Sequence, residues 1–133
     1  MKILGVDYGK RRLGLAYAES SLASPYKVIS FDSQENALSY LSEEIRRNDV
    51  KFVVFGISEG KMAEDTYKFA KRLKAITKIR TAFQDETLST NRALSLSLNA
   101  NIKRKKRKLL KDAYSAAIIL QDFLDSNSKL FGE

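Results

Sequence analysis

The first stretch of the chain, residues 3–17, joins two apolar runs through a basic turn that contains glycine. Runs of this kind at residues 3–8 and 12–18 are typical of two antiparallel strands with a short connection. Asp7 lies near the end of the first run. A carboxylate inside a strand loses contact with water, and this desolvation costs free energy unless other interactions replace the water. Hydrogen bonds donated in the turn at Gly9 would compensate it, and so would a metal ion shared with other acids. This stretch alone leaves both explanations open.

The absence of cysteine and histidine from the 133 residues narrows the chemistry available to this chain. Without cysteine there are no disulfides, zinc–thiolate sites or thiol nucleophiles. Without histidine there is no Ser-His-Asp triad and no imidazole base. An enzyme of this composition has to use carboxylates, hydroxyls, lysine, arginine, tyrosine or a metal ion held by oxygen ligands. A chain of this length with 44% hydrophobic residues suits a single domain over residues 1–133.

Charge and hydropathy indicate the partner and the location. The formal net charge of +8 favours a polyanionic partner, with nucleic acid first, although a basic surface can also be unengaged. No apolar run approaches the roughly 20 residues that a membrane-spanning helix needs. Lys2 interrupts the apolar start before a signal peptide could form. We therefore expect a cytoplasmic protein with no membrane partner.

Hydrophobic periodicity predicts the remaining elements. Further strands are expected at residues 28–31, 51–57 and 79–83, and helices at 36–48, 61–76, 88–98 and 109–125. A polar loop is expected at residues 19–27, and Ser33 or Asp32 would cap the first helix. The core face of the second helix is expected to carry Tyr67, Leu73 and either Phe69 or Ala70.

This order of elements, β-β-β-α-β-α-β-α-α, predicts an α/β fold with a five-stranded mixed sheet. The first three strands form an antiparallel meander, and βαβ units add the parallel part. The continuous apolar run at 51–57 indicates that helices cover both faces of the sheet. Ligand sites in such folds lie at the carboxyl ends of strands. Three polar points fall there: Asp7, the turn at Ser58 and Glu59, and the pair Asp85 and Glu86.

Two later acids, Glu86 and Asp112, are candidates to join Asp7. Glu86 follows a predicted strand almost directly, although an acid there would also suit the N-terminus of the next helix. Asp112 lies at helical spacing from an apolar stripe made of Ala116, Ile119 and Phe123. It would also suit the first turn of its helix, where backbone N–H groups would satisfy it. Each acid alone therefore has a structural explanation.

Taken together, Asp7, Glu86 and Asp112 predict a carboxylate cluster. Carboxylates held close repel one another unless protons or cations neutralise them. Mg²⁺ or Mn²⁺ is the usual partner, because these ions take oxygen ligands and keep waters. Two such ions about 3.5–4 Å apart can activate a water and stabilise the leaving oxygen in phosphodiester hydrolysis. The three acids are therefore the candidate catalytic residues and the candidate ligands of a pair of Mg²⁺ or Mn²⁺ ions.

Three motifs then point to a family. Residues 7–14 read D-Y-G-K-R-R-L-G, residues 85–90 read D-E-T-L-S-T, and a basic run precedes D-A-Y-S-A-A-I-I-L-Q at 112–121. In this order they resemble the D-x-G-x-x-R-x-G, D-E-R-L-[ST]-T and D-x-x-A-A-x-x-I-L-Q segments of the YqgF-type family. This family belongs to the RNase H-like superfamily, and its members are named as Holliday junction resolvases or precursor-16S rRNA nucleases. The resemblance covers nearly the whole chain and implies an RNase H-like nuclease domain with catalytic acids at Asp7, Glu86 and Asp112.

The chain departs from the family pattern at two places. Thr87 stands where the family usually has arginine, which puts one cationic substrate contact in doubt. The turn at residues 56–61 is shorter than the usual loop containing G-L-P, which puts substrate contacts from that loop in doubt. Neither departure touches the three acids.

Basic residues gather in two segments that are expected to bind the nucleic-acid backbone. Six consecutive cations are Lys103, Arg104, Lys105, Lys106, Arg107 and Lys108, and three more, Lys10, Arg11 and Arg12, follow Asp7 closely. A charged segment that only faces solvent would normally contain both acidic and basic residues. These segments contain basic residues alone, which favours phosphate binding. Such contacts bring affinity and orientation with little base specificity. Recognition of shape is therefore expected rather than reading of sequence.

These features predict a metal-dependent endonuclease acting on structured nucleic acid, with the 5′ end of pre-16S rRNA as the expected substrate. A Holliday junction resolvase acting on branched DNA is one alternative. A ribosome-assembly factor that binds nucleic acid without turnover is another. A phosphotransferase of the actin and sugar-kinase type would share the D-x-G turn, but it needs a second domain. A resolvase would suit a twofold homodimer and an RNA-trimming enzyme a monomer, so both states stay open.

Overall fold

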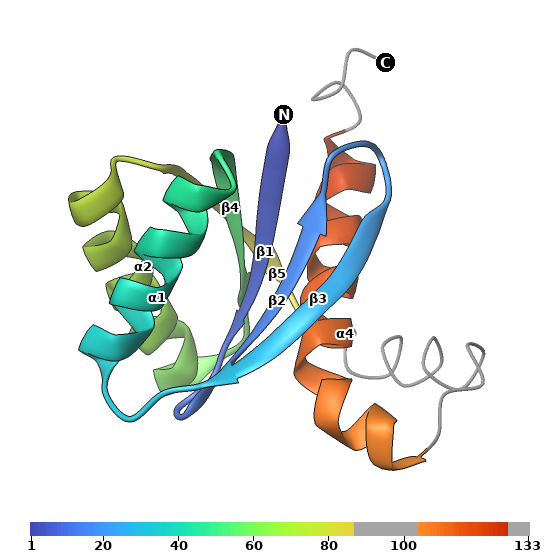
Figure 1. The fold of residues 1–133 in the computed structure, drawn as a ribbon, viewed down its shortest axis with the longest axis horizontal. Coiled ribbons are helices and arrows are strands. Elements are labelled where there is room, and N and C mark those ends of the chain that lie inside the picture. Colours follow the sequence, from blue (N-terminus) through green and yellow to red (C-terminus); the bar gives the residue numbers. More distant parts are fainter. Residues whose placement is uncertain (87–103, 128–133) are drawn as a thin grey trace.

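The opening stretch folds as the predicted hairpin. In the computed structural model, β1 (Lys2–Tyr8) and β2 (Arg12–Ala18) pair antiparallel, with Asp7 opposite Gly14. The structure describes residues 1–86 and 104–127, and side chains are described for 1–86 and 110–127. The five strands follow the order β3-β2-β1-β4-β5 (Figure 1).

The third strand is longer than the sequence suggests. β3 (Ala23–Ser30) pairs antiparallel with β2 and takes in much of the segment expected to be a polar loop. It contains Pro25, which an edge strand tolerates because one side of the strand makes no ladder hydrogen bonds. The pairing shifts register there, since Leu15 faces Lys27 while Ala16 faces Pro25. The expected loop at 19–27 was therefore wrong over its second half.

The parallel half of the sheet forms as predicted. β4 (Val50–Ile57) runs parallel to β1, and β5 (Arg80–Asp85) runs parallel to β4. The two connecting helices are α1 (Gln34–Arg47) and α2 (Gly60–Thr77). Ser33 caps α1, because its side-chain oxygen accepts a hydrogen bond from the N–H of Asn36 at 3.1 Å.

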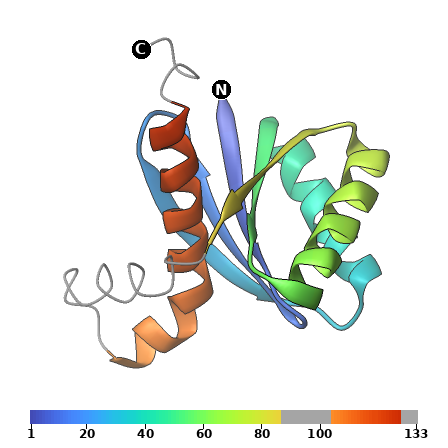
Figure 2. The same ribbon diagram turned by 180° about the vertical axis from the view of Figure 1, so that it is seen from behind.

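Helices cover both faces of the sheet. α1 and α2 lie on one face, and α4 (Arg104–Ser126) lies across the other (Figures 1 and 2). α4 begins earlier than the expected residue 109, because the lysines and arginines before that point are good helix formers. The helix expected at 88–98 lies outside the described residues. Within the described parts of the chain, no helix is both long and apolar enough to cross a membrane.

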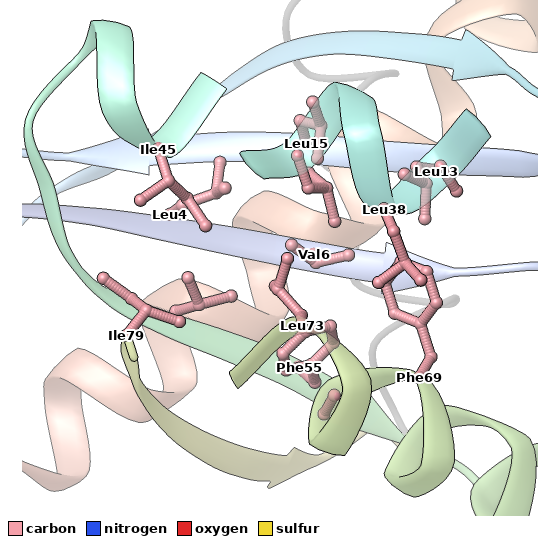
Figure 3. Packing of buried hydrophobic residues seen from close by; sticks show 14 of the residues in the cluster. Leu4, Val6, Leu13, Leu15, Leu38, Ile45, Phe55, Phe69, Leu73 and Ile79 are labelled. Atoms are coloured by element: carbon pink, nitrogen blue, oxygen red, sulfur yellow. The ribbon is translucent and has the colours of Figure 1, made fainter. Parts of the chain in front are cut away.

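The main core fills the space between the sheet and the pair α1 and α2. Leu4, Val6, Leu13 and Leu15 of the first two strands meet Leu38, Ile45, Phe69 and Leu73 of the helices (Figure 3). Phe69, Ala70 and Leu73 of α2 are buried as expected, and so is Thr66. Tyr67 was expected in the core but is 48% exposed. The helix presents Thr66 instead, one position before Tyr67.

Small residues line the opposite face of the sheet. The alternation that turns Leu4 and Val6 toward the main core turns Ile3, Gly5 and Asp7 toward α4. The second cluster on this face joins Ile3, Ala16, Ala18 and Val54 of the sheet to Ala116, Ile119, Leu120 and Phe123 of α4. This burial confirms the predicted apolar stripe of the last helix. It also brings the helix backbone close to the sheet, at the end of β1 where Asp7 lies.

Candidate active site

Asp112 reaches Asp7 because the neighbouring strand has no side chain in the way. Gly14 of β2 lies opposite Asp7, and a Cβ atom at Gly14 would lie 2.0 Å from the backbone oxygen of Asp112. α4 therefore crosses the sheet directly over Gly14, and only glycine allows that approach. Asp112 lies more than two turns inside a helix that begins at Arg104. Unpaired backbone N–H groups are found only in the first turn, so the helix-terminus explanation for this acid was wrong.

Glu86 is held at the end of β5 by the strand beside it. Its backbone N–H donates a hydrogen bond to the carbonyl oxygen of Ile57 at 3.0 Å, which extends the pairing of β4 with β5 by one residue. A Cβ atom at Gly56 would lie 2.7 Å from Oε2 of Glu86 and 2.3 Å from Cδ1 of Ile119. A second glycine therefore leaves room for the carboxylate between the sheet and α4.

Asp7 and Glu86 are in direct contact, and Asp112 is close enough to act on them electrostatically. Burial raises the pKa of Asp7 from 3.8 to about 8, and the negative charges of Glu86 and Asp112 and a hydrogen bond with Glu86 add to the increase. Burial also raises the pKa of Glu86. Asp7 therefore holds a proton at neutral pH and shares it with Glu86. The N–H of Gly9 donates to the carbonyl oxygen of Arg12 at 2.9 Å and so does not compensate Asp7.

A cleft of about 380 Å³ opens beside these acids. Its lining consists of Asp7, Gly9, Lys10, Arg11, Arg12 and Asp112. Nε of Arg12 lies 3.5 Å from Oδ2 of Asp112, and the Arg12 side chain is 61% exposed. In residues 1–86 and 104–127, no three acidic side chains are arranged as a ready-made metal site. Asp7 therefore pairs with Glu86 through a hydrogen bond, and Asp112 pairs with Arg12 through an ion pair.

The predicted basic residues lie in two places, the end of the first hairpin and the start of α4. Lys10 and Arg11 in the turn, and Arg12 at the start of β2, line the cleft. Residues 104–108 lie in the first turns of α4, and Lys103 lies outside the described residues. Sequence reasoning missed Lys111, whose positive charge partly offsets the rise in the pKa of Asp7. Its position directly before Asp112 was the signal that could have identified it.

Gly56, which lies beneath α4, gives a prediction about packing and acid placement. The Gly56→Ala variant is expected to lose activity and about 1–3 kcal/mol of unfolding free energy, because the new methyl group overlaps Ile119 and crowds Glu86. Adding Ile119→Val removes the overlapping Cδ1 atom. This double variant is expected to recover stability in urea unfolding but not cleavage. Recovery of both would show that Gly56 serves packing alone.

Comparison with known proteins identifies the family. The sequence matches the family described as "RuvX: Holliday junction resolvase" over residues 1–126. The chain belongs to the RuvX family. This confirms the resemblance drawn from the three motifs, and the predicted class of enzyme, a nuclease, agrees with the names of the RuvX relatives.

Two RuvX relatives illustrate the match. A protein of Endomicrobium trichonymphae is 38% identical, over 96% of this chain and 97% of the relative. A protein of Syntrophomonas wolfei is 34% identical, over 96% of each. Both carry the name "Putative pre-16S rRNA nuclease".

Solved structures confirm the RNase H-like fold. The fowlpox virus resolvase in complex with Holliday junction DNA aligns with a TM-score of 0.70 at 13% identity, over 97% of this chain and all of the viral chain. Thermus thermophilus RuvC in complex with a Holliday junction substrate aligns with a TM-score of 0.61 at 16% identity, over 96% of each chain. At these identities the likeness concerns the fold.

Proposed function

We propose that this chain is a divalent-metal-dependent endonuclease that processes the 5′ end of pre-16S rRNA, with residues 1–133 acting as one nuclease domain. The observation that carries the proposal is the contact between Asp7 and Glu86 beside a basic cleft, with Asp112 within electrostatic reach. The names of RuvX relatives favour an RNA substrate over branched DNA. Resolution of Holliday junctions is the second candidate, favoured by the family description.

The chemistry of the acids fits Mg²⁺ or Mn²⁺. All three candidate ligands are carboxylates, which suit these hard cations. Burial, together with the negative charges of Glu86 and Asp112, raises the pKa of Asp7, and a cation held there would offset both effects. Asp7 and Glu86 would hold the metal directly. Asp112 would join them after leaving Arg12, which accounts for the absence of a ready-made triad among the described acids. When bound, two such ions would supply an activated water and neutralise charge on the leaving oxygen.

The side chains of this protein perform the remaining tasks. Lys10 and Arg11 at the cleft attract the phosphate backbone and orient the scissile phosphate toward Asp7. Arg12, released from Asp112, becomes available to a phosphate oxygen, for which the planar guanidinium is well shaped. Asp7 would have to lose its proton to hold a metal ion, since a carboxylate binds metal only in its charged form. The basic first turns of α4 extend the phosphate-binding surface.

The test compares substrates and metals side by side. Purified protein is incubated with a pre-16S rRNA fragment and with a four-way DNA junction, each with Mg²⁺, with Mn²⁺ and with EDTA. We expect cutting of the RNA near the mature 5′ end in the presence of metal and none in EDTA. Symmetric cutting of the junction instead would assign the resolvase activity, and a stable dimer would accompany it. Binding without cleavage in any condition would favour a non-catalytic ribosome-assembly factor.

A further inference from the structure

Two exposed aromatic rings meet on the last strand of the sheet. Phe83 of β5 is 39% exposed and Tyr67 of α2 is 48% exposed, and their ring centroids are 4.6 Å apart. Among the side chains that the structure describes, this is the one ring contact in which both partners are exposed. Phe83 also stacks on buried Phe55 at 6.0 Å, so its ring is anchored from below. The pair is therefore a fixed apolar surface open to solvent.

A hollow of about 280 Å³ lies against this pair. Its lining consists of Ile57, Ser58, Glu59, Tyr67, Phe83 and Asp85. The two carboxylates in this lining disfavour a phosphate group, and carboxylates accept hydrogen bonds from the amino groups of bases. A flat aromatic surface with acceptors at its rim has the chemistry that takes a nucleobase rather than a backbone.

The hollow lies next to the candidate active site but on the other face of the sheet. Phe83 packs toward α2, whereas Glu86, three residues along, lies beside α4. Three residues of extended strand span about 10 Å. A nucleic-acid strand that joins the two places must turn around the end of β5. An unpaired strand can make that turn, and a stacked duplex cannot.

We propose that Phe83 and Tyr67 form a subsite that stacks one unpaired base near the scissile phosphate. The proposal rests on the nuclease function given above and adds its substrate feature, a single-stranded segment beside the cut. The cations at the cleft hold the backbone, and the aromatic pair fixes the register of the strand along it. The subsite thereby sets which phosphate faces the acids.

The test measures binding in EDTA, where no cleavage occurs. The ligands are a fluorescent RNA duplex with a single-stranded 5′ extension and the same duplex with a blunt end. Tyr67→Leu and Phe83→Leu keep an apolar side chain and remove the ring. Each is expected to weaken binding of the extended RNA by about 5- to 100-fold and to leave the blunt duplex unchanged. Tyr26→Leu, which removes a ring with 44% exposure on β3, is the matched control and should change neither affinity.

A second series of binding measurements identifies which base of the extension occupies the subsite. Each nucleotide of the extension is replaced in turn by an abasic one. One position is expected to weaken binding by wild-type protein, and the same replacement should have no further effect on Phe83→Leu. Equal losses for extended and blunt RNA, or no loss at all, would overturn the subsite while leaving the nuclease proposal intact. If wild-type protein bound neither RNA, the proposed function would fall, and the subsite with it.

Discussion

Replacing Asp7 by asparagine is expected to abolish cleavage and yet to stabilise the metal-free protein. Loss of a direct metal ligand should lower the rate by about a thousandfold or more, in the range seen when one member of a catalytic group is removed. The gain in stability follows from the pKa of Asp7, which burial and the charges of Glu86 and Asp112 raise to about 8. Asparagine removes the acid and keeps an N–H group that can donate to Glu86.

The pH dependence of the unfolding free energy shows why removing this acid stabilises the protein. Below about pH 4, Asp7 is protonated in both the folded and the unfolded chain, and its full contribution to stability is present. Between about pH 4 and pH 8 the unfolded chain releases this proton while the folded protein keeps it, so unfolding free energy falls as pH rises. The loss is on the order of a few kcal/mol at pH 8. The Asp7→Asn variant should lack this loss.

Urea unfolding in EDTA from pH 4 to pH 8 measures the effect, and cleavage assays with Mn²⁺ on the same preparations measure activity. Adding Mn²⁺ should raise the melting temperature of the wild type and not of the variant. Asp49→Asn is the matched control, because this acid is 83% exposed and its positive φ suits asparagine. A variant that cuts RNA at the wild-type rate would remove Asp7 from the catalytic group.

Gly14→Ala is expected to have the second largest effect. The new Cβ atom would lie 2.0 Å from a carbonyl oxygen in the backbone of α4, at Asp112 itself. Backbone atoms cannot turn aside as a side chain can, so the helix has to move away from the sheet. We expect a loss of about 3 kcal/mol in unfolding free energy. A shift of about 1 Å in Asp112 should also lower cleavage by about a hundredfold.

The Gly5→Ala variant separates the loss of stability from the displacement of Asp112. Gly5 lies under the same helix, but its added Cβ atom would meet Cβ of Leu120 at 2.9 Å, which is a milder overlap and further along α4. This variant should lose some stability and keep most of its cleavage activity. Both quantities are measured by urea unfolding and by the initial rate of RNA cleavage. Equal losses of activity in the two variants would mean that Gly14 does not place Asp112.

The elements that the sequence predicted well are those with a strong local pattern. The apolar run at 51–57 is continuous, which indicated a strand covered on both faces. The stripe that ends at Phe123 has a helical period, which indicated the buried face of the last helix. The third strand was placed too late because Pro25 and its polar neighbours resemble a loop, and only the pairing with β2 makes them a strand. Tyr67 was misplaced because the helix turned by about one position, which tertiary packing decides.

The same distinction applies to the candidate site. Asp7, Glu86 and Asp112 were chosen as a set from their places on strands and a helix. The sequence could not indicate which side chains each acid contacts in the metal-free protein. The contact between Asp7 and Glu86, and the pairing of Asp112 with Arg12, depend on distances between elements that are far apart in the chain. The glycines that set those distances are ordinary strand residues until the helix above them is known.

The position of α4 has a consequence for protein synthesis. Asp7 is made early and Asp112 late, and the helix that carries Asp112 also covers Ile3 and Val54 on the sheet. A nascent chain that has not yet released α4 from the ribosome has an uncovered apolar face and lacks its third acid. The three candidate acids therefore come together only after α4 has docked on the sheet.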